Sequence, residues 1–311
     1  MGISRQQASE CLCSDDLIGV GMEADAVRRR LHPEGVVSYA VECAVSMTDG
    51  MCAGGKAGEA SHQRLYDEIR NTIDLGSTGV RLVSCLDSYS MPRKIDCCEA
   101  IVRGIRQRFP SLWIEALSPT EILALVADNG RDLRETITRL RDAGLDSIAC
   151  DDIHSKCSLA DWINVHRTAH YLGMRTVATL HFGAGETLSQ RIDTLAAIRQ
   201  LQEETGGFAA FVPVATEAVS GRELDAVTAV EQLKTRAVAR VFLDNIENIQ
   251  WNGSAQGLKV LQTGLRFGAN DAGSVAPKGI GASEEDLRRI IRDAGFKPVQ
   301  RDTPYRTMFL N

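Results

Sequence analysis

The sequence lacks several features that mark whole classes of protein. Its 311 residues carry a formal net charge of −6, and Lys and Arg form no basic cluster, so nucleic acid is not an expected partner. No apolar run approaches the roughly 18 residues that span a bilayer, and MGISRQQASE at the start has no signal-peptide core. We therefore expect a cytoplasmic protein with no membrane partner.

The sequence also lacks paired cysteines at metal-binding spacing. Nine cysteines are present, but none forms a CxxC pair or a metal-finger pattern. For a cytoplasmic protein of this size we expect no disulfide framework. Four cysteines fall in helical stretches, where small packed residues are the simplest interpretation: Cys11, Cys13, Cys97 and Cys98.

Strand-like apolar runs alternate with amphipathic helical stretches after a helical extension over residues 1–35, and eight such pairs can be counted. The predicted strands are 36–45, 79–85, 112–116, 146–150, 174–181, 208–214, 241–246 and 264–268. Capping signals mark helix starts at Ser118, Ser158, Thr187 and Ser283. Over residues 36–311 this pattern predicts a (β/α)8 TIM-type barrel with a C-terminal cap; an open doubly wound sheet is the alternative.

In such a barrel the active site lies at the carboxyl ends of the strands. Polar and sulfur-containing side chains follow the predicted strand ends: Cys52, Cys85, Glu115, Cys150, Asp151, Asp152, His154, His181, Glu217, Asn252, Asn270 and Asp271. A half-buried carboxylate or imidazole can be tuned towards neutrality, so Glu115, His181 and Asp151 are candidates for acid–base catalysis. An ordinary polar rim role is the alternative for each, and Asn270 and Asp271 are either turn residues or ligand hydrogen-bonders.

Two other patterns suggest metal binding. Three of the cysteines (Cys52, Cys85 and Cys150) could join His154 in a tetrahedral site for a soft metal, or they could be unrelated residues on different strands. His166 and His170 are spaced to share one helical face, but Arg167 stands where a zinc protease has glutamate, so we expect an outer-helix role.

Sequence blocks in one order along residues 31–307 resemble a known enzyme family. They are LHPEGVVSYAVE, RQRFPSLWIEALSPTEI, AGLDSIA, RTAHYLGMRTVAT, LQEETGGFAAFVP, ARVFLDNIENIQ, LRFGANDAGS and IRDAGFKPVQRDTPYR. The chain resembles the radical-SAM enzymes of the futalosine route to menaquinone, most closely the dehypoxanthine futalosine cyclase; the aminofutalosine and deazaflavin (FO) synthases are more distant. The resemblance implies a barrel whose first strand precedes a CxxxCxxC motif that binds a [4Fe-4S] cluster and S-adenosylmethionine.

The aligned positions depart from the motifs of that family. The three cluster cysteines fall on Met51, Gly55 and Gly58. The glycine pair after strand 2 falls on Ser84 and Cys85, the GGGAE after strand 4 falls on residues 150–154, and a histidine of strand 3 is Glu115. Since an iron–sulfur cluster depends on thiolate ligands, we expect no [4Fe-4S] cluster here.

The leading hypothesis is a cluster-free enzyme that binds S-adenosylmethionine or a nucleoside-like small molecule at the barrel mouth. It would perform polar chemistry, as a transferase or lyase, with Glu115 or His181 as base. The proposed cofactor-binding residues are Cys85, Cys150, Asp152, His154, Asn270 and Asp271. The alternatives are an inactive paralogue that binds a partner, and a metal-dependent enzyme with a rebuilt Cys/His site.

Overall fold

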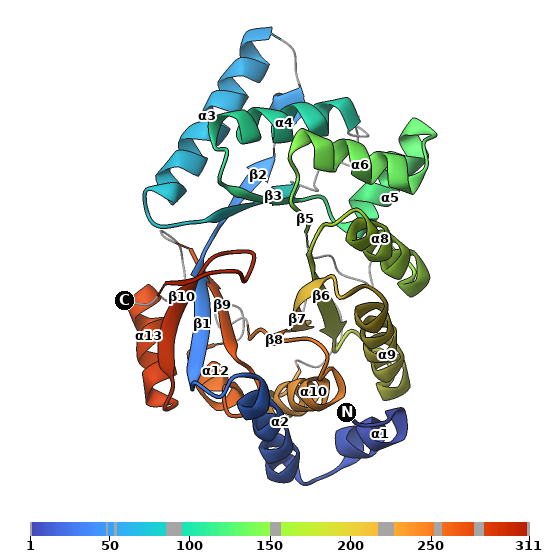
Figure 1. Ribbon diagram of the computed structural model, residues 1–311, viewed down its shortest axis with the longest axis vertical. Coiled ribbons are helices and arrows are strands. Elements are labelled where there is room, and N and C mark those ends of the chain that lie inside the picture. Colours follow the sequence, from blue (N-terminus) through green and yellow to red (C-terminus); the bar gives the residue numbers. More distant parts are fainter. Residues whose placement is uncertain are drawn as a thin grey trace.

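The computed structural model describes residues 2–47, 49–52, 55–84, 95–149, 157–216, 227–251, 257–276 and 283–309. Parallel strands form a ring, and helices surround it (Figure 1). The strands are β1 (Val36–Val41), β2 (Cys43–Met47), β3 (Gly79–Ser84), β4 (Trp113–Ala116), β5 (Ser147–Ile148), β6 (Thr176–Phe182), β7 (Phe208–Ala215), β8 (Asn248–Ile249), β9 (Asp271–Val275), β10 (Lys297–Arg301) and β11 (Met308–Phe309).

Strand pairing forms most of the ring; β1 continues into β2 after residue 42, and β5 lies beside β6. The hydrogen-bonded orders are β2-β3-β4-β5, β6-β7-β8 and β11-β10-β1-β9, and every pair but β10–β11 is parallel. A bridge from Gln250 to Asp271 joins the β8 segment to β9, and β9 pairs with β1. The predicted (β/α)8 barrel is therefore confirmed, because an open sheet would leave β1 and β9 as separate edges.

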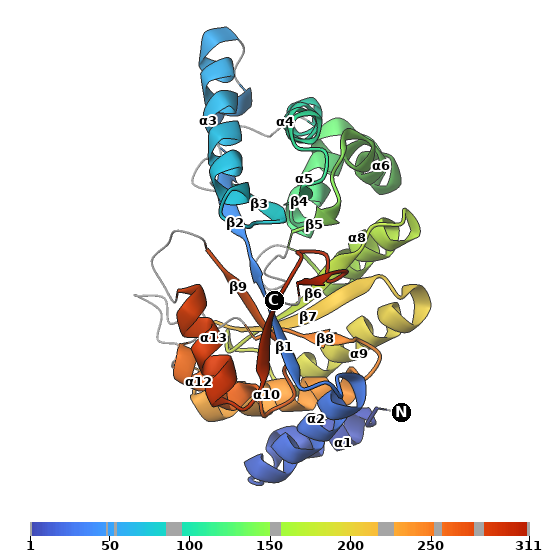
Figure 2. The same ribbon diagram turned by 60° about the vertical axis from the view of Figure 1, so that its left-hand side comes forward.

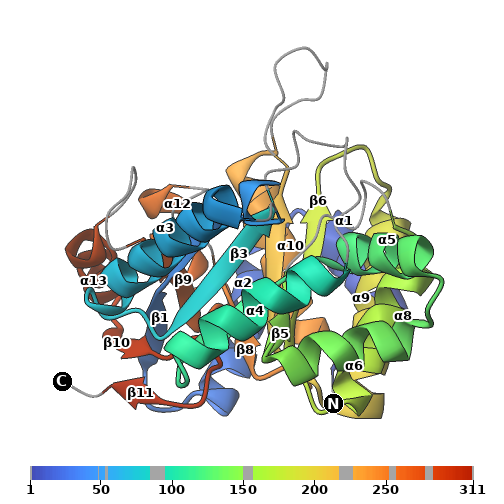
Figure 3. The ribbon, with the colours of Figure 1, turned by 90° about the horizontal axis from the view of Figure 1, so that it is seen from above.

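Helices cover the outside of the ring (Figures 1 and 3). They are α1 (Arg5–Cys13), α2 (Leu17–Leu31), α3 (Gly55–Ile73), α4 (Ile95–Arg108), α5 (Pro119–Asn129), α6 (Leu133–Ala143), α8 (Leu159–Tyr171), α9 (Leu188–Thr205), α10 (Ala229–Phe242), α12 (Leu258–Gly264) and α13 (Glu284–Asp293), with a 3₁₀ helix at Asp49–Cys52. Helices α1 and α2 lie close to α10 (Figure 2). Within the described residues, none of the helices combines the length and apolar character needed to span a membrane.

Local capping fixes where several helices begin. The Ser118 hydroxyl accepts the amide N–H of Glu121, and the Glu121 carboxylate accepts the amide N–H of Ser118. The same reciprocal pattern starts α9 at Thr187 and α13 at Ser283, and Ser158 caps α8. All four predicted starts are confirmed, because each depends on residues only three positions apart.

Two predicted strands are wrong. Residues 241–246 include the end of α10, and residues 264–268 lie at the end of α12 and the turn after it; the strands are β8 and β9 instead. Helix α10 is buried on nearly all sides from Leu233 to Phe242, so its apolar run shows no helical period. β10, with the sequence KPVQR, was not predicted, because it combines a proline with charged residues.

Candidate functional site

Alternation along β3 and β4 places two charged residues on the inner face of the ring. Val80 and Leu82 of β3 and Ile114 of β4 are buried in the core beneath the outer helices. Successive side chains of a strand point to opposite faces, so Arg81 and Glu115 point inward. The two residues are register partners on neighbouring strands.

Arg81 and Glu115 form an ion pair at the edge of the buried interior. The Arg81 Nε donates to the Glu115 Oε1 at 2.6 Å, and the side chains are 42% and 7% exposed. Burial raises the pKa of Glu115, an effect that the Arg81 charge opposes and the Glu42 charge strengthens. A carboxyl group that retains its proton more readily than an ordinary glutamate is suited to proton transfer.

A second buried ion pair connects β9 to β10. The Arg301 Nε donates to the Asp271 Oδ2 at 2.5 Å, and Asp271 is fully buried. The same carboxylate accepts from the Ser38 hydroxyl at 2.6 Å and from the Gly273 amide at 2.9 Å. These donors satisfy both oxygens of Asp271. The sequence-based role of Asp271, as a turn residue or a ligand hydrogen-bonder, stays a prediction.

Arg301 was missed because its strand was not predicted. Its Nη1 lies 3.8 Å from the Glu42 Oε1, and its charge also lowers the pKa of Glu115. We call Glu42, Arg81, Glu115, Asp271 and Arg301 the interior charge cluster. Charges from β3, β4, β9, β10 and the end of β1 therefore meet inside the barrel.

Asn270 serves to hold strands together. Its Oδ1 accepts from the Arg240 Nη2 at 2.7 Å and from the Ile249 amide at 2.9 Å, and its Nδ2 donates to the Asn248 Oδ1 at 2.9 Å. Arg240 is itself fully buried in α10. This network connects β8 to the segment before β9. Ligand binding by Asn270 stays a prediction.

His181 lies on the inner face of β6. Leu180 on one side of it and Phe182 on the other are buried, which places the half-buried His181 on the opposite, inner face. In the ring, β5 lies between β6 and the Glu115 strand β4. The remaining expected mouth residues lie outside the described residues: Cys85, Cys150, Asp151, Asp152, His154, Glu217 and Asn252.

The histidine pair of α8 is a buried packing unit. His166 and His170 each hydrogen-bond the Thr176 hydroxyl at 2.9 Å and contact the ring of Phe208. Burial lowers the pKa of His166 well below its usual value and that of His170 to about 4. The expected outer-helix role is confirmed.

The cysteines correct two expectations. Cys52, after β2, forms a disulfide with Cys97 of α4, so the expectation of no disulfide is wrong and Cys97 is more than a small packed residue. The physical reason is that α4 packs against the 3₁₀ helix, which brings the two Cα atoms to 5.5 Å. A bonded Cys52 supplies no thiolate to the proposed Cys/His metal site.

Among the described residues, no set of three Cys, His, Asp or Glu side chains lies close enough to hold a metal ion. Met51 is buried, and its carbonyl accepts from the His62 Nε2 at 2.9 Å. The side chains of Cys43, Cys85 and Cys150 lie outside the described part of the chain.

Several known proteins are similar to this chain in sequence. A family model described as the CofH/MqnC C-terminal region matches residues 205–310. The cyclic dehypoxanthine futalosine synthase of Streptomyces coelicolor is 30% identical, with 97% of this chain and 85% of the relative covered. A 5-amino-6-(D-ribitylamino)uracil–L-tyrosine 4-hydroxyphenyl transferase of Methanococcoides burtonii is also 30% identical, with 92% and 90% covered.

A solved structure supports the fold. Methylornithine synthase superposes with a TM-score of 0.66 over 96% of this chain and 94% of its own, at 14% identity. At that identity the likeness concerns the barrel architecture alone.

These relatives overturn two expectations. The cluster-free enzyme with polar chemistry and the absence of a [4Fe-4S] cluster were inferred from the replaced motif positions. The relatives are radical-SAM enzymes, which use such a cluster with S-adenosylmethionine, and their similarity covers nearly the whole chain. The inference failed because it relied on aligning a few short motifs, whereas similarity along the full chain carries more information about descent.

Proposed function

Because the chain belongs to the futalosine and FO synthase group of radical-SAM enzymes, we propose that it is an enzyme that binds S-adenosylmethionine and a small heterocycle carrying a ribose or ribityl chain. The names of two relatives support this substrate class, since one makes a cyclic futalosine and the other acts on a ribitylamino-uracil. The proposed binding place is the inner face of the barrel beside the interior charge cluster.

The observation that carries the proposal is the Arg81–Glu115 pair on that inner face. Polar groups that converge inside a barrel, with one pKa displaced, are typical of binding sites. Around the pair, the inward-facing Val83 is 42% exposed and Ser46 is exposed, so the inner faces of β2 and β3 are accessible.

Each residue has a defined part in this proposal. Arg81 orients the polar edge of the heterocycle through its guanidinium N–H groups, which suit planar carbonyl or carboxylate acceptors. Glu115 holds or moves a proton at its carboxyl oxygen, and His181 of β6 is the second candidate for proton transfer. Cluster ligands are not among the described residues, so these roles are limited to binding, orientation and proton transfer.

Calorimetric titration tests the proposal on the full chain. S-adenosylmethionine and 5-amino-6-(D-ribitylamino)uracil are titrated into the parent, Arg81→Met and Arg103→Met proteins. We expect the Arg81 variant to bind the uracil about tenfold or more weakly, as expected for a lost charged hydrogen bond. Arg103 is an exposed residue of α4 and serves as the matched control.

Two results would contradict the proposal. One is no binding heat from either ligand with the parent protein. The other is an equal loss of affinity in the Arg81 and Arg103 variants, which would show that the effect is not local to the inner face.

A further inference from the structure

The disulfide between Cys52 and Cys97 lies at the surface of the folded protein. Cys52 is the last residue of the 3₁₀ helix Asp49–Cys52 and is exposed, whereas Cys97 is half-buried. A disulfide is cleaved by a thiolate that attacks one of its two sulfurs, so access decides which sulfur reacts. Exposed disulfides are the labile ones, because they react without unfolding. Cys52 is therefore the expected point of attack.

Cys97 is placed to leave as a thiolate. It is the third residue of α4, which begins at Ile95 and is 14 residues long. The unpaired amides in the first turn of a helix stabilise negative charge, including that of a thiolate. In thiol–disulfide exchange a sulfur that is more stable as a thiolate leaves faster. Attack at Cys52 thus releases the better leaving group.

Arg139 of α6 neutralises the acidic side chains beside Cys97. Its Nε donates to the Glu99 Oε1 at 2.7 Å, and its Nη2 donates to the Asp96 Oδ1 at 2.7 Å. Without Arg139, these two carboxylates would repel a departing thiolate in the same helical turn. The ion pairs reduce that repulsion, and they also connect the first turn of α4 to α6.

Each end of the disulfide is also held by contacts that do not involve sulfur. Met51, next to Cys52, is buried, and its carbonyl oxygen accepts from the Nε2 of His62 in α3 at 2.9 Å. On the other side, Arg139 holds the start of α4. Both elements therefore remain folded when the disulfide is cleaved, and what is lost is the covalent link between them.

We propose that the Cys52–Cys97 disulfide is a site of thiol–disulfide exchange with a dithiol reductant, and that it links the segment after β2 to α4 reversibly. One thiolate of the reductant attacks the Cys52 Sγ. The bond between the two cysteines breaks, and Cys97 leaves as a thiolate that takes a proton from water. The second thiol of the reductant then attacks the mixed disulfide and releases Cys52. Two electrons and two protons pass to the protein, and the dithiol becomes a disulfide.

The kinetics of reduction test the exchange on the full chain under native conditions. Dithiothreitol is the probe, and alkylation followed by peptide mass spectrometry measures the free thiols. We expect the rate to rise in proportion to the dithiothreitol concentration and to be unchanged by urea below the unfolding transition. A rate that does not depend on dithiothreitol, or that rises steeply with urea, would show that the disulfide reacts only after unfolding and would overturn the proposal.

A monothiol identifies the sulfur that is attacked. With glutathione, the mixed disulfide should form on Cys52 in about tenfold excess over Cys97, because Cys52 is the more exposed residue. Peptide mass spectrometry after acid quenching measures the two adducts. An adduct mainly on Cys97 would overturn the assigned direction of exchange.

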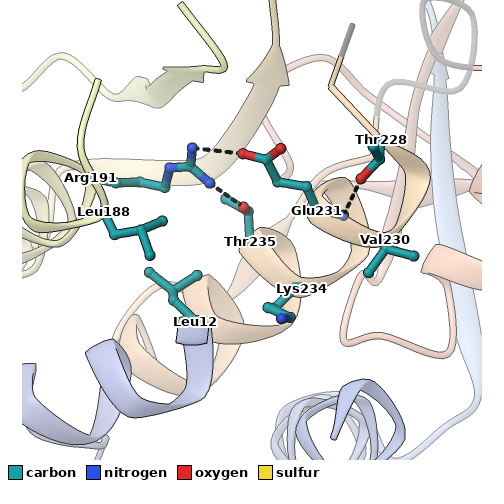
Figure 4. A pocket seen from close by; sticks show the side chains of 8 residues that line it. All are labelled: Leu12, Leu188, Arg191, Thr228, Val230, Glu231, Lys234 and Thr235. Carbon is teal, nitrogen blue, oxygen red and sulfur yellow. Dashed lines mark hydrogen bonds and ion pairs between the residues drawn. The ribbon is translucent and has the colours of Figure 1, made fainter. Parts of the chain in front are cut away.

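A pair of variants with the same change of charge tests the leaving group. Arg139→Met should slow reduction about twofold or more, since the two carboxylates then disfavour the Cys97 thiolate. A loosened α4 alone would speed reduction, so the direction of change separates the two effects. The control is Lys234→Met, at a cavity of about 230 Å³ between α1, α9 and α10 (Figure 4), and its rate should equal that of the parent. Equal rates in the two variants, or faster reduction of Arg139→Met, would contradict the role of Cys97.

Hydrogen–deuterium exchange tests the reversible link. In the reduced protein, the amides of residues 49–52 and 95–98 should exchange about tenfold faster than in the oxidised protein. Amides of α9 and α10 should not change, because those helices lie towards the other end of the long axis (Figure 1). Cys97→Ser has no disulfide and should match the reduced parent. Unchanged exchange at both segments would show that the disulfide does not restrain them and would overturn this part of the proposal.

Discussion

At the scale of single residues, Glu115 shows how one buried carboxyl depends on its neighbour. Arg81 is 42% exposed on one side of the pair, and Glu115 is almost completely buried on the other. Removing only the exposed partner therefore leaves a charge in a place that disfavours charge.

We predict that Arg81→Met lowers the free energy of unfolding at pH 8 by about 2 kcal/mol, less than the loss for a fully buried pair because Arg81 is partly screened by water. Burial raises the pKa of Glu115, so stability falls as pH rises from its ordinary pKa to the raised one. Urea unfolding measures both effects. In a Glu115→Gln background the cost of Arg81→Met should nearly vanish; an undiminished cost would contradict the ion pair.

The two histidines of α8 predict an acid sensitivity. The pKa of His170 is about 4 in the folded protein and near 6.5 as an ordinary value. The unfolded chain therefore takes up a proton first as the pH falls below 6.5. This difference should cost about 2 kcal/mol of stability between pH 7 and pH 5, with His166 adding to it in the same direction.

Urea unfolding at pH 7 and pH 5 checks this prediction. His170→Gln keeps a hydrogen-bonding side chain but does not titrate, so it should lose less stability than the parent over this range. An equal loss in the two proteins would assign the acid sensitivity to other groups.

At the scale of elements, the disulfide connects the segment after β2 to α4. Cys52 and Cys97 are 45 residues apart in the sequence, and closing a loop of that length in the unfolded chain removes much of its entropy. The bond therefore stabilises two neighbouring outer elements of the barrel relative to the unfolded state.

We predict that Cys97→Ser lowers the free energy of unfolding by about 2–4 kcal/mol under non-reducing conditions, measured by urea unfolding. Cys13→Ser, at an exposed free cysteine, is the control and should cost little. Alkylation followed by peptide mass spectrometry should label Cys52 only after reduction. Labelling of Cys52 before reduction would contradict the bond.

At the scale of the whole molecule, the barrel closes where β9 and β10 flank β1. The Asp271–Arg301 pair links those two flanking strands, and Ser38 of β1 donates to the same carboxylate. The closure thus depends on a buried ion pair as well as on backbone hydrogen bonds.

We predict that Arg301→Met lowers the free energy of unfolding by about 3–5 kcal/mol, because it leaves the Asp271 carboxylate buried without a counter-charge. Asp271→Asn in the same chain should recover part of that loss. The control is Arg289→Met, which breaks an exposed ion pair at 2.9 Å and should cost less than about 1 kcal/mol. Equal losses for Arg301→Met and Arg289→Met would show that the closure does not depend on the buried pair.

The sequence by itself determined the alternation of strands and helices, the helix starts at Ser118, Thr187 and Ser283, and the strand that carries Glu115. These follow from residues a few positions apart, because capping boxes and periodicity are local. The family resemblance was also readable, since it depends on ordered blocks along the whole chain. The short strands β8 and β9 were not, because their segments are too brief or too polar to show alternation.

Only the tertiary structure decided which charges meet. Arg81 faces Glu115 because of the register between β3 and β4, and Arg301 reaches Asp271 because the chain returns beside β1 after α13. Cys52 meets Cys97 through the packing of α4 against the 3₁₀ helix. Such pairs lie tens of residues apart in sequence, so their contact is set by closure of the barrel and by helix packing, which no local pattern encodes.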